Sequence, residues 1–319
     1  MKHDHGAATG EPGAVTSDAT LDVIQPFQLE LSNLRGRVVR AGPTLDEILC
    51  RHAYPEPVAR LLAQTITLAI TLAAALKYEG IFTLQTKGDG PVKLTVADVT
   101  SVGDVRGYAQ FDEEALAGWT PPADGKGLVP SLLGKGYLAF TVDQGEHTQR
   151  YQGIVELDGD DLDDCVRHYF RQSEQLPTGI EVAVGRDGAG WIGGAVMLQT
   201  LPDEDAGSAG AVPSNIEDDW RRAMILMGTV TEAELLDRGL PVNALLFRLF
   251  HEEGVRVYRS QAIRPSCRCS RERVATVLRS IDREELDDLR TETGHVAVTC
   301  EFCNSTYAFD DKDLDQVYG

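Results

Sequence analysis

The distribution of apolar and polar positions divides the chain into a strand-rich first part and a later part with short helices. Scattered apolar residues from Leu29 to Arg40 predict a first strand, which ends at the turn signal Ala41-Gly42-Pro43. A helix is expected to begin at Leu45. From Val58 to Tyr78, Leu, Ile and Ala cover most of the helical circumference, as a helix beneath a sheet requires. This stretch predicts the central helix of the core.

After Gly80 the apolar residues follow the two-residue period of strands. A Gly- and Pro-rich turn at 88–91 separates the first two of these strands. The pattern predicts a meander, a hairpin, a helix and a last strand pair: Ile81–Thr86, Val92–Val96, Val105–Phe111, Gly136–Val142, Tyr151–Leu157, Leu162–Gln175, Ile180–Val184 and Trp191–Leu201. The predicted fold class is therefore α+β, an antiparallel-sheet core domain with a buried helix.

The segment Pro202 to Ser214 is acidic, rich in Gly and Ala and without periodicity, which is typical of a linker. Three short helices are expected after it, at Ile216–Leu226, Thr231–Arg238 and Val242–His251. Thr231 and Glu234 have the spacing of a capping box. Helices shorter than about 12 to 15 residues are barely stable alone in water, so these should depend on their neighbours.

These patterns predict four regions: a disordered tail at 1–22, the α+β core domain at 23–201, a linker with short helices at 202–260, and a small C-terminal zinc-binding domain at 261–319. The polar N-terminus lacks the apolar region of a signal peptide or anchor. The longest apolar stretch, Leu61 to Leu76, is shorter than the ~20 residues that span a bilayer. We therefore expect neither export nor membrane insertion.

The formal net charge of -20 gives solubility and repels polyanions, so nucleic-acid or anionic-membrane binding would need a strong local basic patch. No such patch is evident in the sequence. Six cysteines in a chain without an export signal indicate reduced thiols or metal ligands rather than a disulfide framework. The expected compartment is the cytoplasm.

The most informative motif is Cys267-Arg268-Cys269 followed, after thirty residues, by Cys300-Glu301-Phe302-Cys303. Two close pairs separated by a short, partly helical segment can bring four sulfurs to one tetrahedral point, the arrangement that zinc prefers. Unliganded thiols or two local disulfides are the alternatives. A helix at Arg271–Arg279, a second between Asp282 and Gly294, and apolar cover from Tyr307 and Phe309 are also expected in this domain. The sequence predicts one Zn²⁺ per chain, bound by Cys267, Cys269, Cys300 and Cys303.

A zinc site with four protein ligands leaves no position for water or substrate, so it should be structural rather than catalytic. Oxidants attack thiolates, however, and therefore compete with the metal for the same sulfurs. Since structural zinc supplies about 10 to 16 kcal/mol to such small modules, its loss should unfold the domain. The short helices could then lose order and uncover apolar residues that bind unfolded chains, among them Leu245, Leu246, Phe247, Leu249 and Phe250.

The remaining candidate ligands and thiols have simpler interpretations. Cys50 and Cys165 are isolated in helical contexts and are expected to be small core residues. His295 could replace a cysteine ligand, but four thiolates already complete the site, so we expect it on a strand surface. No catalytic residue set is predicted, because the motifs of serine hydrolases, zinc proteases and nucleotide-binding loops are absent.

Two other classes of zinc protein are the alternatives: a zinc deaminase and a zinc-ribbon nucleic-acid-binding protein. A zinc deaminase would show H-x-E before P-C-x-x-C, a spacing that His251 and Cys267 do not match, and it would leave Cys300 and Cys303 unused. A zinc-ribbon nucleic-acid-binding protein is the better competitor, because Arg268, Arg271 and Arg273 could contact phosphates. Against it, the segment 261–319 has 8 Lys and Arg but 12 Asp and Glu.

From Leu29 to Val317 the chain resembles the bacterial redox-regulated chaperones called heat-shock protein 33. The resemblance rests on Val105-Arg106-Gly107-Tyr108, Gly134-Lys135-Gly136-Tyr137, the segments 141–145 and 151–157, and the order of C-x-C before C-x-x-C. It implies an ATP-independent holdase that is inactive while zinc is bound. It also implies that oxidation pairs Cys267 with Cys269 and Cys300 with Cys303, releases zinc, unfolds the linker and favours a homodimer that holds unfolded client proteins. The N-terminal extension departs from this pattern. The client-binding surface, the oxidant and the extent of linker unfolding are left open.

Overall fold

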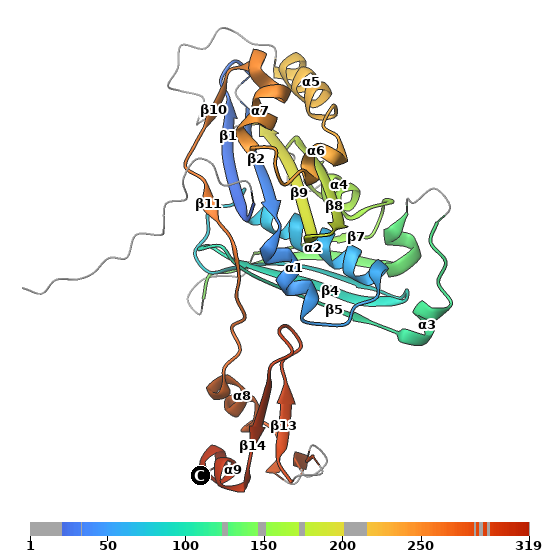
Figure 1. Cartoon of the computed structure of the whole chain (residues 1–319), viewed down its shortest axis with the longest axis vertical. Coiled ribbons are helices and arrows are strands. Elements are labelled where there is room, and N and C mark those ends of the chain that lie inside the picture. Colours follow the sequence, from blue (N-terminus) through green and yellow to red (C-terminus); the bar gives the residue numbers. More distant parts are fainter. Residues whose placement is uncertain are drawn as a thin grey trace, which may run out of the picture.

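The computed structural model describes residues 21–32, 34–122, 127–145, 151–171, 176–200, 216–283, 285–286, 290–291 and 294–318. These residues form two large sheets and a separate two-stranded hairpin. Figure 1 shows the two sheets on opposite sides of one long helix, with the small C-terminal domain below the second sheet. The sequence prediction of an α+β fold with antiparallel sheets and a buried helix is confirmed.

The first sheet has the order β10-β1-β2-β9-β8, and β11 also pairs with β1. Its strands are β1 (Val23–Leu29), β2 (Leu34–Ala41), β8 (Thr178–Asp187), β9 (Gly190–Thr200), β10 (Val255–Val257) and β11 (Gln261–Ala262). Alternation along β2 and β9 sends Val39 and Ala195 into the main core, while Val38 and Val196 enter a second apolar cluster. The sheet is thus covered on both faces.

The second sheet has the order β12-β5-β4-β3-β6-β7. Its strands are β3 (Ile81–Gly88), β4 (Val92–Thr100), β5 (Asp104–Phe111), β6 (Gly136–Asp143), β7 (Tyr151–Glu156) and β12 (Arg264–Pro265). The predicted meander and hairpin are confirmed, and they join one sheet because β3 pairs with β6. Along β4, Thr95 faces the core, where its hydroxyl lies 2.9 Å from that of Thr65, and Asp98 faces the opposite side.

Helix α2 (Glu56–Ala73) lies between the two sheets and is buried over most of its length. The hydroxyl groups of Thr65, Thr67 and Thr71 donate to carbonyl groups four residues earlier, so these polar side chains are satisfied inside the core. The other core helices are α1 (Pro43–Cys50), α3 (Glu113–Ala117), a π turn (Val129–Leu133) and α4 (Leu162–Tyr169). Among the residues described, no helix has both the length and the apolar character needed to cross a bilayer.

Three linker helices cover the outer face of the first sheet: α5 (Ile216–Met227), α6 (Glu232–Leu236) and α7 (Val242–Phe250). The predicted capping box is confirmed, because Thr231 and Glu234 exchange side-chain and backbone hydrogen bonds. Helix α6 approaches β9 so closely that a Cβ atom on Gly194 would collide with the carbonyl oxygen of Leu235. The linker helices are therefore packed tightly on the core.

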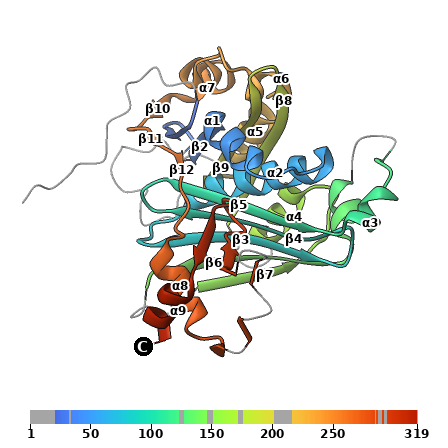
Figure 2. The ribbon, with the colours of Figure 1, turned by 60° about the horizontal axis from the view of Figure 1, so that its bottom comes forward.

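The C-terminal domain contains α8 (Arg271–Leu278), β13 (Val296–Thr299), β14 (Thr306–Phe309) and α9 (Asp311–Tyr318). Its small apolar core consists of Leu278, Leu286, Val296, Phe309, Leu314 and Val317. Figure 2 shows this domain in front of β4, β5 and β6, on the side of the second sheet away from α2. The domain has few buried residues of its own, so it needs another source of stability.

Several predicted boundaries were wrong. The strand predicted from Leu29 to Arg40 corresponds mainly to β2, the second strand of a hairpin with β1. β1 itself was not predicted, because Pro26 interrupts its short apolar run. The central helix ends at Ala73 rather than Tyr78, since the amides of Ala75 and Leu76 bond to carbonyls only three residues earlier. Residues 1–20 of the tail predicted at 1–22, the linker at 202–214 and much of the helix at 282–294 lie outside the described residues.

Candidate metal and redox centre

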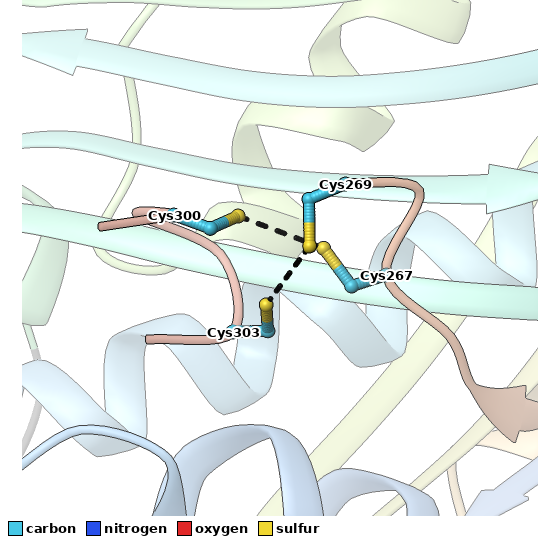
Figure 3. Close-up of side chains that lie close together, drawn as sticks. All are labelled: Cys267, Cys269, Cys300 and Cys303. Atoms are coloured by element: carbon cyan, nitrogen blue, oxygen red, sulfur yellow. Dashed lines mark hydrogen bonds between the residues drawn. The ribbon is translucent and has the colours of Figure 1, made fainter. Parts of the chain in front are cut away.

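The four cysteines of the two predicted pairs come together, although the pairs are thirty residues apart. Cys267 and Cys269 follow β12, and Cys300 and Cys303 lie in the turn between β13 and β14. Their sulfur atoms all lie within 4.8 Å of one another. The Sγ atoms of Cys267 and Cys300 are 3.7 Å apart, and those of Cys269 and Cys303 are 3.3 Å apart (Figure 3).

This arrangement fits a tetrahedral metal ion. With metal–sulfur bonds of about 2.3 Å, the sulfurs of a tetrahedral zinc site are separated by about 3.8 Å. The observed sulfur separations are close to that value. Four soft sulfur donors also match the ligand preference of zinc, and such a set leaves no open coordination position.

The hairpin between β13 and β14 positions the second cysteine pair. The amide of Cys300 donates to the carbonyl of Ser305, and the amide of Asn304 donates back to the carbonyl of Cys300. Asn304 has a φ of 59°, in the left-handed region that asparagine tolerates better than most residues. At the first pair, Ser270 caps α8 by accepting from the amide of Arg273. Both pairs are thus fixed by local backbone structure.

The thiols of Cys269 and Cys303 have different pKa values. Burial, together with the neighbouring thiols, raises the pKa of Cys269 to about 12. Burial acts in the same direction on Cys303, but hydrogen bonds from Ser305 and the other thiols lower its pKa to about 6. The hydroxyl of Tyr307 donates to the Cys269 sulfur at 3.1 Å. Polar groups around the cluster can therefore stabilise negative charge on sulfur.

Residues interleaved with the cysteines attach the cluster to the core domain. Arg268 donates to the carboxylate of Asp98 on β4, which is 5% exposed and also accepts from Arg106 at 2.8 Å. The guanidinium carbon of Arg106 lies 3.8 Å from the ring centroid of Phe302. Asn304 donates to the carbonyl of Arg51. The four-sulfur cluster therefore lies directly against the second sheet.

The arginines that the nucleic-acid hypothesis required have partners within the chain. Arg268 is paired with Asp98, and Arg271 pairs with Asp313 at 2.7 Å. Arg273 donates to the carbonyl of Arg268. Each of the three arginines is thus engaged by a group of its own chain.

The other residues singled out from the sequence lie elsewhere. Cys165 is fully buried, as predicted, and burial raises its pKa to about 12. The prediction for Cys50 was wrong: it is exposed at the end of α1, with its sulfur near Asp46. His295 is exposed, as expected. Sequence reasoning missed Asp98, because a lone acidic residue inside a strand shows no signal of a partner 170 residues away.

The fold and the sulfur cluster together define a protein with an α+β core, a helical cover and a four-cysteine domain suited to a metal. The family model described as Hsp33 protein matches residues 22–310 of this chain. The chain therefore belongs to the Hsp33 family of chaperones.

Curated relatives extend over nearly the whole chain. The 33 kDa chaperonin of Caulobacter vibrioides is 39% identical over 297 residues, covering 91% of this chain and 95% of its own length. That of Escherichia coli is 36% identical and covers 93% and 94%. The crystal structure of the 33 kDa chaperonin from Thermotoga maritima superposes with a TM-score of 0.78 at 25% identity, over 93% of this chain and 97% of that one. These relatives are thus all named as 33 kDa chaperonins.

Proposed function

We propose that this chain is a redox-regulated, ATP-independent holdase whose four cysteines bind one Zn²⁺ in the reduced, inactive state. The observation that carries the proposal is that one short chain segment connects the cysteines to the linker helices that cover the first sheet. Cys267 follows β12 by two positions, and β12, β11 and β10 lead back along the chain to α7. Unfolding of the backbone around the cysteines can therefore be transmitted to the linker helices through the segment from β10 to β12.

Zinc would hold Cys267, Cys269, Cys300 and Cys303 as thiolates and supply most of the folding free energy of the small domain. Oxidation would pair Cys267 with Cys269 and Cys300 with Cys303. For each disulfide, two thiolates lose two electrons, and a hypochlorous acid molecule that accepts them together with one proton from solvent leaves as chloride and water. Sulfurs joined in this way no longer carry the charge that binds the metal.

The strands between the cysteines and the linker are held by few bonds. β12 pairs with β5 at Arg264 and Pro265, and β11 pairs with β1 at Gln261 and Ala262. β10 pairs with three residues of β1. Segments this short gain little from their own sheet pairing, so their order depends on the packed domains at both ends. Unfolding of the cysteine domain would release them.

Release of this segment would loosen the linker helices from the first sheet. The contact between them is apolar: Phe250 of α7 stacks on Phe27 of β1 with ring centroids 5.7 Å apart. On the sheet the covered residues are Val23, Phe27, Leu29, Leu34, Val38, Ala183, Val196 and Leu198. An apolar face of this kind, once exposed, would bind unfolding proteins by the hydrophobic effect.

The clients in this proposal are unfolding proteins, and the exposed faces of two oxidised chains would favour a homodimer. The expected compartment is the cytoplasm, where reduced thiols can retain zinc. Stable binding to nucleic acid or membranes is not part of the function, in keeping with the net charge of -20.

The test is aggregation of a thermally unfolding client protein, followed by light scattering without ATP. The oxidised chain should suppress scattering at near-stoichiometric amounts, and the reduced zinc-loaded chain should not. A fluorescent duplex and a single strand, offered to the reduced chain over a range of salt concentrations, test the zinc-ribbon alternative. Salt-sensitive binding to either, without client protection after oxidation, would replace the proposal with that alternative.

A further inference from the structure

A cavity of about 350 Å³ lies between the two sheets, beside the C-terminal end of α2. It is far from the cysteines in sequence and is formed by the core domain alone. Its body is apolar and aromatic, with contributions from Phe82 on β3, Phe140 on β6 and Tyr169 on α4. Both its volume and its lining match those of small-molecule sites.

The charges at this cavity are opposite in sign to those of the whole chain. Among the described residues, the lining contains two cations, Arg35 and Lys77, and no Asp or Glu. A further cation, Arg37, lies close enough for Arg35 to contribute to lowering its pKa to about 10, although burial is the larger cause. The described lining of the cavity therefore carries net positive charge.

Two buried polar atoms at the same end have no hydrogen-bond partner among the described residues. They are Nε of Arg35 and Oε1 of Gln199. Arg35 and Gln199 are register partners on β2 and β9, so one donor and one acceptor stand side by side. Gln199 is 2% exposed, and its Nε2 already donates to Thr178 at 3.2 Å. Buried polar groups are normally satisfied by protein, water or ligand, so this pair can take a partner that enters the cavity.

We propose that this cavity is a binding site for a medium-chain monocarboxylate with a hydroxyl group near its carboxylate. The carboxylate accepts from Arg35 and is attracted by Lys77, and the hydroxyl donates to Oε1 of Gln199. The hydrocarbon chain lies among the aromatic side chains. This site is independent of the proposed redox function, because none of the described cysteine or linker residues lines it.

The test is isothermal titration calorimetry of the reduced, zinc-loaded full chain with 3-hydroxydecanoate below its micelle concentration. Decanoate, which lacks the hydroxyl, should bind several-fold more weakly, and decylamine, which reverses the charge, should show no binding. Arg35→Met should weaken binding of the hydroxy acid at least tenfold. Lys135→Met, an exposed charge outside the cavity, is the matched control and should leave affinity unchanged.

A second variant fills the cavity without altering charge. Ala75 lines the apolar part, so Ala75→Phe should occupy ligand space and abolish the titration signal while the far-UV circular dichroism stays the same. Equal affinity for decylamine and the acid, or unchanged affinity in both Arg35→Met and Ala75→Phe, would overturn the proposal. Because the assay contains neither oxidant nor client protein, its outcome does not depend on whether the chain is a holdase.

Discussion

The side chain of Arg268, between two cysteines of the cluster, donates to the buried carboxylate of Asp98 in the core domain. Asp98 also accepts from Arg106 and, at 2.6 Å, from Thr83. One carboxylate thus joins the cysteine domain to the second sheet. Since the contact comes from within the C-x-C motif, rearrangement of those cysteines should disturb it directly.

Asp98→Asn should weaken the attachment of the cysteine domain to the core. It removes the negative charge that Arg106 and Arg268 share, which we expect to cost about 1–3 kcal/mol. Hydrogen exchange at residues 264–269 should accelerate in the reduced protein, and less oxidant should be needed to release zinc. Asp315→Asn is the matched control, because Asp315 pairs with Arg283 inside the same domain and makes no ion pair with the core. Equal effects of both variants would contradict this role.

Two phenylalanines on α7 allow a test of the apolar contact between the linker helices and the first sheet. Phe250 is fully buried against Phe27, whereas Phe247 is 68% exposed. Phe250→Ala should destabilise the linker packing by about 3–5 kcal/mol. It should therefore give measurable client protection in the reduced, zinc-bound protein. Phe247→Ala should change stability by less than about 0.5 kcal/mol and remain inactive until oxidised. A reduced Phe250→Ala protein without client protection, yet with an opened linker by hydrogen exchange, would show that this face does not bind clients.

The cysteine cluster can be tested through its metal content. Cys303→Ser removes one of four ligands, so the purified protein should hold far less than one zinc per chain by atomic emission. Near-ultraviolet circular dichroism should show the loss of fixed packing around Phe309 and Tyr318. Cys50→Ser, which alters an exposed thiol outside the cluster, should retain a full complement of zinc. Full zinc content in Cys303→Ser would exclude the four-cysteine site.

Glu253 gives the linker packing a dependence on pH. Its carboxylate accepts from Arg222 of α5 and from Ser32, and the bonds to Arg222, its largest influence, lower its pKa. Because the folded pKa lies below the unfolded value of about 4.3, the stabilisation is present above that pH. It is lost as the pH falls through the folded pKa.

Glu253→Gln should therefore lower the free energy of unfolding by about 1–2 kcal/mol at pH 7, since Arg222 is partly exposed and solvent screens the pair. The difference from the parent protein should shrink as the pH falls below about 4. Urea unfolding at several pH values measures both effects. Glu252→Gln changes the adjacent, exposed carboxylate and should have no comparable effect. A pH-independent loss would show that charge is not responsible.

The parts of the structure that follow from local pattern could be predicted, and those that depend on distant partners could not. The α2 helix, the meander and the two cysteine pairs have periodicity or spacing that is visible within a few residues. By contrast, β11 and β12 are two residues long and form only because their partners already exist. The contact of Arg268 with Asp98, and the cavity at Arg35 and Gln199, join segments far apart in the chain. Such contacts arise from tertiary packing and have no local sequence signal.

The most direct test of the central claim follows zinc and client protection in one sample. A metallochromic dye reports free zinc while hypochlorite is added to the reduced chain, and light scattering reports aggregation of a thermally unfolding client. The account predicts that about one zinc leaves per chain, that protection appears only after its release, and that thiol reductant with zinc reverses both signals. Release of zinc without any gain in client protection would contradict it and leave the four cysteines with a purely structural role.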